Sequence, residues 1–259
     1  PCPFWLWTDT EGEGSACSPT FTNVAFRDNR AADGGGAVAL VTDEGEASPS
    51  FTRVRFEDNA TEGRANAYGG NGGAFFALAF RHAWVSPTFT DVTFEANTST
   101  GSGGAVEFFV SVGSVSNPVF EGVTFAGNTA GLDAGGLHIH TQDGEANSVA
   151  PLFSNVRFEG NTARRRGGGA VINTTRRGAS VVAPAFVNVA FVENTADAVG
   201  GLELGSRSGN TLDAEITNAL FARNVVASSI GALAVNGTDT DAVVSTSTIT
   251  ANESRVGSA

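Results

Sequence analysis

The apolar residues of this chain recur with a period of about 31 residues and do not follow the 3.6-residue spacing of a helix. Six of these periods contain the pattern Pro-x-Phe-x-x-Val-x-Phe, as in residues 19–26. The Val and the second Phe are two residues apart, so they share one face of a strand. The first Phe precedes the Val by three residues, so the chain must bend between them if all three side chains face a core. The pattern therefore predicts short strands joined by tight bends.

Three sequence marks repeat in a fixed order. The first is Phe-x-x-Asn, whose asparagines are spaced by 30, 38, 31, 33, 33, 30 and 28 residues: Asn29, Asn59, Asn97, Asn128, Asn161, Asn194, Asn224 and Asn252. The second is a Gly-Gly pair with a following Ala or Leu, as in Gly35-Gly36-Ala37, Gly103-Gly104-Ala105 and Gly135-Gly136-Leu137. The third is a proline placed before the first Phe in six copies. Such ordered repetition indicates a solenoid, in which each repeat is one coil.

The chemistry of these marks favours a β-solenoid. Asparagine tolerates left-handed backbone angles and bonds neighbouring backbone, and paired glycines permit a second tight corner. Helical solenoids are excluded by the missing 3.6-residue pattern, and a propeller blade needs about 40 residues and four strands. We therefore predict an all-β fold, a single right-handed parallel β-helix of about eight coils of roughly 31 residues, with the handedness taken by analogy. Its core would be a ladder of Phe on Phe, and its asparagines a column of hydrogen bonds from coil to coil.

The whole chain, residues 1–259, is interpreted as one domain. Residues 1–17 would form an N-terminal half-coil or cap, residues 18–252 the repeats, and residues 253–259 a truncated last coil, because residues 4–13 align with the second half of a repeat. One interpretation is a fragment of a longer array. The other is that half-coils of two subunits complete each other head to tail, with Trp5, Trp7 and Ile249 at the interface. For the tryptophans themselves we favour a cap plug, with an interface anchor as the alternative.

The charge and hydrophobic content of the chain restrict the classes of partner that we expect. The chain has 41% hydrophobic residues, 27 acidic residues and 15 basic residues, all arginine, for a net charge of −12. A surface this acidic repels phosphate backbones and anionic lipids, so we expect no nucleic-acid partner. No apolar run approaches the roughly 18 residues of a membrane-spanning helix, so we expect no membrane insertion of this chain. No cofactor is expected.

Two cysteines, Cys2 and Cys17, flank one short N-terminal loop. We predict that they form a disulfide that staples the first segment; the alternative is two buried free thiols. A disulfide implies export, and the absence of Met fits a processed piece.

His138 and His140 sit two apart in one predicted strand, followed by Asp143 and Glu145. They suggest a metal or catalytic cluster. The alternative, which we adopt, is that Leu137 and Ile139 face the core and both histidines face water, because the sequence places no third ligand.

Two further groups carry charge. Glu107 and Glu203 lie in corresponding strands three coils apart, about 14 Å by stacking, which is too far for a pair of glycosidase carboxylates. Five arginines cluster around one Gly-Gly-Gly motif and form a candidate patch for an acidic ligand, the alternative being a solvated loop: Arg164, Arg165, Arg166, Arg176 and Arg177.

Phe-x-x-Asn followed by Gly-Gly-Ala and an aliphatic residue resembles the repeat of the polymorphic outer-membrane proteins. The chain is also similar to the longer Ser-Pro-Thr-Phe-Thr-Asn-Val-x-Phe repeats of large secreted bacterial β-helix proteins, over about residues 18–252. The resemblance implies a secreted or cell-surface protein that is structural or adhesive and not enzymatic. Its partners would be itself, stacked head to tail into filaments, or surface glycans and proteins. The alternative is a β-helix polysaccharide lyase or hydrolase, or a glycan-binding protein.

Overall fold

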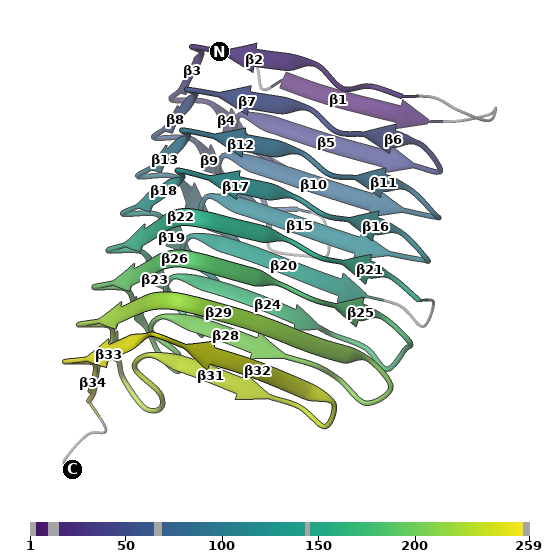
Figure 1. Ribbon diagram of the computed structural model, residues 1–259. Coiled ribbons are helices and arrows are strands. Elements are labelled where there is room, and N and C mark those ends of the chain that lie inside the picture. The colour runs from purple at the N-terminus through teal and green to yellow at the C-terminus, as the bar shows by residue number, and fades with distance from the viewer. Residues whose placement is uncertain (1–3, 10–15, 65–68, 143–145, 256–259) are drawn as a thin grey trace.

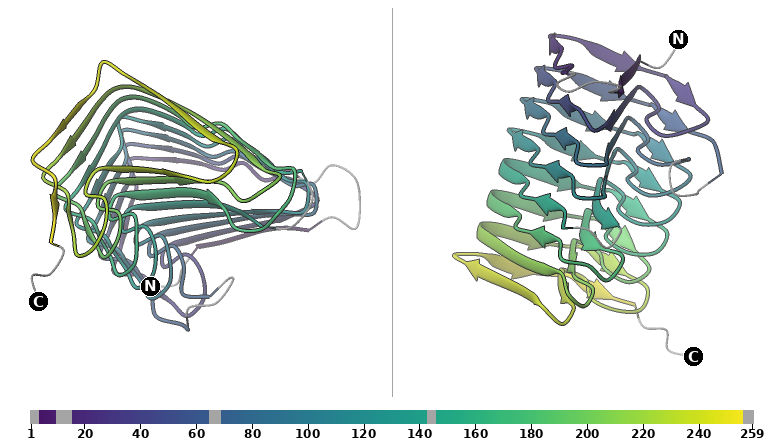
Figure 2. Two further views of the ribbon diagram at one scale, coloured as in Figure 1. Left: turned by 90° about the horizontal axis from the view of Figure 1, so that it is seen from below. Right: turned by 90° about the vertical axis from the view of Figure 1, so that its right-hand side faces the viewer.

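The computed structural model describes residues 4–9, 16–64, 69–142 and 146–255. Within them the chain forms only strands and turns, and the strands stack in parallel from coil to coil (Figure 1). The first of the three sheets has eight strands, so the chain makes about seven full turns from the first of them to the last. Seen from the C-terminal end, the chain runs anticlockwise as it advances toward the viewer (Figure 2). The predicted right-handed parallel β-helix is confirmed, with a coil number close to the expected eight.

Three parallel sheets enclose the core. The first sheet contains β1 (Phe4–Asp9), β5 (Val38–Asp43), β10 (Phe75–Phe80), β15 (Val106–Ser111), β20 (Leu137–Gln142), β24 (Ala170–Thr174), β28 (Leu202–Gly205) and β31 (Leu233–Asn236). The third sheet contains β4 (Arg30–Ala31), β9 (Ala60–Thr61), β14 (Thr98–Ser99), β19 (Thr129–Ala130), β23 (Thr162–Ala163), β27 (Thr195–Ala196), β30 (Val225–Val226) and β34 (Glu253–Ser254).

The second sheet is built from the Pro-x-Phe-x-x-Val-x-Phe segments and the short strands that precede them. It contains β2 (Thr20–Thr22), β3 (Ala25–Arg27), β6 (Glu46–Ala47), β7 (Ser50–Thr52), β8 (Arg55–Glu57), β11 (Trp84–Val85), β12 (Thr88–Thr90), β13 (Thr93–Glu95), β16 (Val115–Ser116), β17 (Val119–Glu121), β18 (Thr124–Ala126), β21 (Ser148–Val149), β22 (Leu152–Glu159), β25 (Val181–Val182), β26 (Ala185–Val192), β29 (Thr211–Ala222), β32 (Thr240–Ser245) and β33 (Thr248–Thr250).

The predicted bend within this segment is present. In the second coil Arg53, just before Val54, has φ 52°, and the corresponding residues of other coils are also left-handed. The bend turns Phe51, Val54 and Phe56 inward together, and all three are fully buried. Non-glycine residues adopt such angles at a cost of about 1 kcal/mol or more, which the burial of two phenylalanines per coil offsets.

Two columns of phenylalanine run along the core. Rings of adjacent coils stack nearly parallel, with centroids 4.6–5.0 Å apart and interplanar angles of 1–9°. One column runs from Phe21 to Phe186, and the other runs from Phe26 to Phe221. The spacing of the rings equals the spacing of strands within a sheet, roughly 4.8 Å, so each added coil extends both columns without repacking.

The asparagine column lies at the corner between the second and third sheets. The backbone N–H and the Nδ2 of Asn97 both donate to Asn128 Oδ1 at 2.9 Å, and Asn97 Nδ2 also donates to the Phe56 carbonyl at 3.0 Å. The same bonds recur from Asn29 to Asn252. The left-handed residue is not the asparagine but the one before it, for example Ala96 with φ 53°. The side chain is therefore required for its hydrogen bonds and not for its backbone angle.

The glycine column differs from the sequence alignment by one residue in the later coils. Strand register aligns five glycines in one column: Gly36, Gly73, Gly104, Gly135 and Gly168. The first three are the second glycine of their pair. The last two are the first glycine of the motif as it was aligned from the sequence. A Cβ on Gly104 would lie 2.1 Å from the Gly135 carbonyl oxygen. Only glycine lets successive coils approach this closely at the corner.

The N-terminal strand occupies the place that the alignment gave it. In β1, Phe4 pairs with Val38 and Asp9 pairs with Asp43. Trp5 and Trp7 lie in this strand, but their side chains lie outside the described part of the chain. Cys17 is a free thiol and Cys2 lies outside the described residues, so the predicted disulfide is not part of the described structure.

The asparagine column yields a prediction about stability. Asn128 is fully buried, and its Nδ2 donates to the Phe94 carbonyl at 3.0 Å and to Asn161 Oδ1 at 2.9 Å. The isosteric change Asn128→Asp removes both donors and places a carboxylate against two oxygens. Because an uncompensated buried charge is costly, we expect the free energy of unfolding to fall by about 3 kcal/mol or more, measured by urea denaturation at neutral pH.

Asn155→Asp is the matched control, since Asn155 is exposed and its Nδ2 donates to Ser154 Oγ. We expect it to change stability by less than about 0.5 kcal/mol. Equal losses in the two variants would show that the buried column does not hold the coils together.

Candidate functional site

The two histidines of β20 lie on the outer face of the first sheet, and the apolar side chains of this strand face the core. Along β20, Leu137 and Ile139 point into the core, and His138 and His140 point outward. The loops between the third and first sheets protrude on this outer side (Figure 2). Both histidines are nonetheless buried, with 5% and 9% of their surface exposed. The expectation that Leu137 and Ile139 face inward is confirmed, and the expectation that the histidines face water is wrong.

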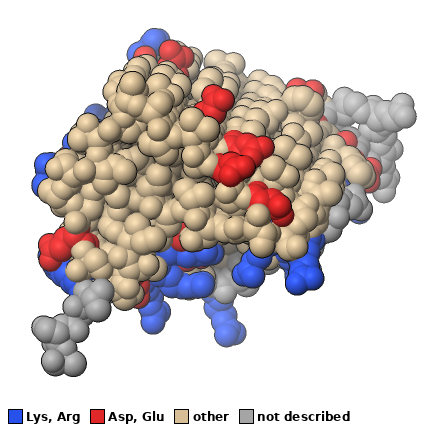
Figure 3. Space-filling view, turned by 60° about the horizontal axis from the view of Figure 1, so that its bottom comes forward, with Lys and Arg blue, Asp and Glu red and all other residues tan. Residues whose placement is uncertain are grey.

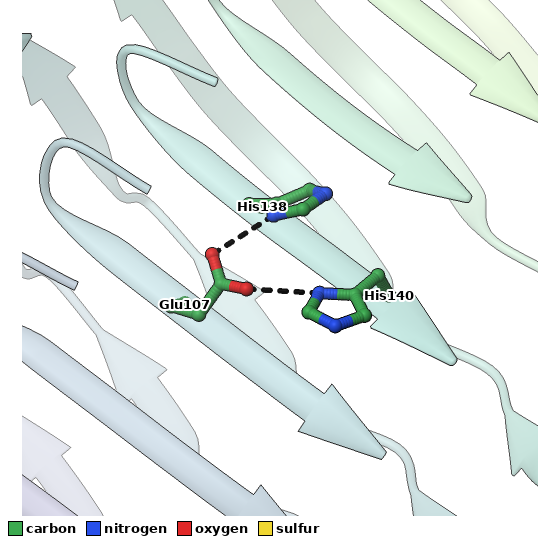
Figure 4. A group of neighbouring side chains, drawn as sticks. All are labelled: Glu107, His138 and His140. Carbon is green, nitrogen blue, oxygen red and sulfur yellow. Dashed lines mark hydrogen bonds and ion pairs between the residues drawn. The ribbon is translucent and has the colours of Figure 1, made fainter. Parts of the chain in front are cut away.

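Glu107 completes a cluster with the two histidines, which we call the His–Glu cluster. His138 Nδ1 lies 2.9 Å from Glu107 Oε2, and His140 Nδ1 lies 2.9 Å from Glu107 Oε1 (Figure 4). The imidazole rings lie 4.8 Å apart at an angle of 30°. Phe109 packs edge-on against His140 with a centroid distance of 4.4 Å. One carboxylate thus faces two imidazoles, and an aromatic ring packs beside them.

Strand register explains why the sequence did not reveal this cluster. Glu107 in β15 pairs directly with His138 in β20, although the two residues are 31 apart in the sequence. Glu203 belongs to the same column, two coils beyond His138, through Val171. The carboxylate that faces the two histidines, Glu107, was one of the two glutamates singled out in the sequence analysis. The useful signal was the repeat spacing itself, since adding one repeat to Glu107 gives His138. Asp143 and Glu145 lie outside the described residues.

Burial and mutual contact shift the pKa values of the His–Glu cluster. Burial alone would raise the pKa of Glu107, but the adjacent charge and hydrogen bond of His138, with His140, hold it below its ordinary value. Burial alone would lower the pKa of His138, but Glu107 raises it overall. Burial lowers the pKa of His140, and its contacts with Glu107 do not reverse that shift. At neutral pH the cluster therefore holds an ionised carboxylate, a His138 that readily accepts a proton and a neutral His140.

A second buried polar group lies beside the first. Arg166 Nη1 lies 2.6 Å from Glu203 Oε1, and Arg166 Nε lies 3.3 Å from Asp133 Oδ1. Asp133 and Glu203 are 6% and 4% exposed. Asp133 and Arg166 act electrostatically on His138, with opposite signs. We call Asp133, Arg166 and Glu203 the Arg166 bridge.

The five clustered arginines therefore separate into different environments. Arg166 is engaged with Asp133 and Glu203, and Arg165 Nη1 lies 3.7 Å from Asp133 Oδ2. Arg164, Arg176 and Arg177 are exposed. In the face shown by Figure 3, basic side chains gather along the lower border, apart from an acidic patch in the middle.

Two cavities extend this polar region along the outer face toward the C-terminal coils. The first, of about 290 Å³, is lined by Arg166, Asn173, Thr174, Thr175, Glu203, Gly205, Ser206, Arg207, Asn236 and Gly237. The second, of about 380 Å³, shares Arg207 with it and adds Arg176 and Arg177. Asn173 pairs in register with His140, so the first cavity begins one coil beyond the His–Glu cluster. Arg207 was not among the arginines predicted from the sequence, because it lies one repeat further along.

The His–Glu cluster has the composition of a metal site. One ligand atom from each of the three residues lies within 4.8 Å of the others. Two imidazole nitrogens and a carboxylate are a ligand set used for divalent transition metals. The Arg166 bridge, in contrast, is a set of ion pairs that fixes the neighbouring coils relative to each other.

Comparison with known proteins identifies the repeat. Residues 91–107 match the family model described as the Chlamydia polymorphic membrane protein repeat. The chain carries this repeat in a β-solenoid. The matched segment begins in the bend of one coil, includes Phe94, Asn97 and the Gly103-Gly104-Ala105 corner, and ends at Glu107. The predicted resemblance to this repeat family is thus confirmed, and the family is one of bacterial membrane proteins. No curated protein and no solved structure matches the chain.

In the part of the chain that the structure describes, no helix is long and apolar enough to span a bilayer.

The His–Glu cluster yields a prediction for the metal-free protein. Replacing Glu107 by Gln removes the charge that raises the pKa of His138 while burial remains, so that pKa should fall below its ordinary value, as followed by NMR of the imidazole. Breaking a buried charged contact should also lower the free energy of unfolding near neutral pH by about 3 kcal/mol. Glu121→Gln, at an exposed position of the second sheet, is the control and should change neither quantity.

The sign of the pH dependence follows from the two shifts. The lowered pKa of Glu107 contributes stability above the unfolded value of that pKa, and this contribution is lost as the pH falls through the folded value. The raised pKa of His138 contributes stability below its unfolded value, and this is lost as the pH rises through the folded value. A stability difference between wild type and Glu107→Gln that did not vary with pH would contradict this account.

Proposed function

We propose that this chain is a non-enzymatic structural or adhesive β-solenoid of the bacterial surface. The observation that carries this is the uniform rod itself, in which both phenylalanine columns and the asparagine column run through the repeats, together with the polymorphic membrane protein repeat at residues 91–107. Every coil adds the same core and the same hydrogen bonds. Such a structure provides length, stiffness and a repeated outer face on which loops can vary.

We further propose that copies of the chain stack end to end. On the last described coil, three core columns present apolar side chains that are partly exposed: Val235, Val244 and Ile249, which are 40%, 41% and 58% exposed. The residues paired with them in the preceding coil, Leu204, Ile216 and Phe221, are fully buried. One further coil would bury these columns, and the first coil of a second copy, which includes β1 with Trp5 and Trp7, is the occupant we propose. Such a head-to-tail contact does not close on itself and builds a filament.

Electron microscopy and sedimentation test this assembly. We expect the chain to form thin fibres at neutral pH, and we expect Ile249→Asp to leave single rods, because an aspartate in the last core column cannot be buried without cost. Val181→Asp is the control, since Val181 is 51% exposed but lies on the side of the solenoid, and it should still form fibres. Single rods for the wild-type chain, or fibres that persist with Ile249→Asp, would refute the assembly.

The arginine-lined cavities favour a second candidate function, a glycan-binding or glycan-cleaving protein. Arg176, Arg177 and Arg207 are exposed along one continuous region of the outer face of the first sheet. Guanidinium groups bind carboxylates and sulfates well because of their bidentate geometry. An acidic polysaccharide is the ligand this region would accept.

A polysaccharide assay separates the two candidates. With acidic and neutral polysaccharides we expect no ultraviolet-absorbing product and no new reducing ends, because the proposed function is not enzymatic. If an acidic polysaccharide binds, Arg207→Ala should weaken that binding and Arg53→Ala, a change at an exposed arginine of the second sheet, should not. Accumulation of a product that Arg207→Ala abolishes would replace the structural function by a lyase or hydrolase.

A further inference from the structure

We propose that the His–Glu cluster binds one divalent transition-metal ion of the Zn²⁺ class, held by His138, His140 and Glu107 and joining two adjacent coils. The ligands come from β15 and β20, and both imidazoles present Nδ1 to the same carboxylate (Figure 4). This inference is independent of filament assembly and of glycan binding.

The hydrogen-bonding capacity of the cluster is incompletely used without an ion. His140 Nδ1 and Glu107 Oε1 lie 2.9 Å apart, yet neither atom has a partner with hydrogen-bond geometry, and His138 Nε2 is also buried without one. Buried polar atoms without partners are rare and costly. His140 Nδ1 and Glu107 Oε1 are therefore close together but are not aligned for a hydrogen bond. An ion between these two atoms would give both of them a partner.

The ligand atoms lie close enough together to surround an ion after side-chain rotation. Zn²⁺ bonds to histidine nitrogen and carboxylate oxygen are about 2.0–2.2 Å, so neighbouring ligand atoms of a tetrahedral site lie about 3.3 Å apart. The two Nδ1–carboxylate distances are 2.9 Å, and the three ligand atoms lie within 4.8 Å of one another. The two Nδ1–carboxylate contacts would have to lengthen by about 0.4 Å, and the most widely separated ligand atoms would have to approach by up to about 1.5 Å; side-chain rotation can supply both changes. Three protein ligands leave one position for water or another ligand.

The local charge also favours a dication. Three buried carboxylates, Glu107, Asp133 and Glu203, lie in this region. Arg166 faces Asp133 and Glu203, Arg165 reaches Asp133 from an exposed position, and Glu107 faces the two imidazoles. Buried charges in proteins are paired or coordinate metals. With neutral imidazoles as its ligands, a divalent ion beside Glu107 would supply positive charge at the one of these carboxylates that faces imidazoles and not an arginine.

The ligand types select the class of ion. Imidazole with one carboxylate suits Zn²⁺, Co²⁺, Fe²⁺ and similar ions, whereas Ca²⁺ and Mg²⁺ prefer shells made of oxygen atoms. Cys17 lies on an earlier coil, outside the cluster. We therefore expect nitrogen and oxygen ligands and no sulfur ligand.

The test uses the whole chain, purified without a histidine tag and stripped of metal with a chelator. Titration with Zn²⁺ by calorimetry should show one ion per chain, and Co²⁺ should give the visible absorption of a four-coordinate site, whereas Ca²⁺ should show neither. His140→Ala and Glu107→Gln should each weaken Zn²⁺ binding by more than the roughly 100-fold that loss of an outer-shell partner causes. His82→Asn is the matched control, because His82 is the third histidine of the chain and lies in an exposed turn with φ 61°; it should bind like the wild type.

A measurement on the wild-type chain keeps the test valid if the variants fail to fold. X-ray absorption of the Zn²⁺-loaded protein should show nitrogen and oxygen ligands near about 2.0 Å, two of them imidazoles, and no sulfur. Absence of stoichiometric Zn²⁺ binding would overturn the proposal, as would a sulfur shell or binding that the His82→Asn change removes.

Discussion

The coil-to-coil hydrogen bond, repeated in register from one end of the rod to the other, is the constraint on which the rest of this structure depends. Parallel strands about 4.8 Å apart bring identical positions of successive repeats directly above one another. The stacked phenylalanines and the asparagine column are consequences of that spacing. Where the polypeptide turns a corner and strand pairing is interrupted, the asparagine side chain supplies the missing bonds, and the glycine column admits the close approach of the next coil.

The same constraint decides where chemistry can be placed. Inward positions are fixed by the core, so a change in residue type there is tolerated only in small steps. The outward positions of the first sheet lie outside the core, several of them are buried, and they form a lattice with one row per coil. A charged or imidazole side chain introduced in one coil meets whatever the neighbouring coils present in the same column. Glu107 and His138 are such neighbours, and the Arg166 bridge spans the following coils.

A lattice of this kind can carry a local site without altering the scaffold. The His–Glu cluster and the Arg166 bridge occupy a few adjacent coils, and the columns of the core pass beneath them unchanged. The proposed structural role and the proposed metal site therefore do not compete. The rod gives reach and stiffness, and the proposed metal site ties two coils together and offers one exchangeable position.

The sequence by itself determined the architecture, because the fold is a sum of nearest-neighbour contacts between repeats. Phe-x-x-Asn and the glycine pair specify one coil, and their recurrence specifies the stack, including the bend before Val54 and the strand register of β1. Two details escaped the pattern: the shift of the glycine column after Gly104, and the left-handed residue that precedes each asparagine. Both depend on backbone geometry at corners, where one residue more or less leaves the hydrophobic pattern unchanged.

Only the tertiary structure decided which polar residues meet. Alternation along β20 correctly predicted that Leu137 faces inward, but it could not show that His138 and His140 would be buried on the outer face. Nor could it show that Arg166 turns toward Asp133 and Glu203 while Arg177 stays exposed. Burial of the outer face and the pairing of its charges are set by the three-dimensional arrangement of variable loops. The core is set by the repeating residues, which is why the sequence predicted the rod and not its site.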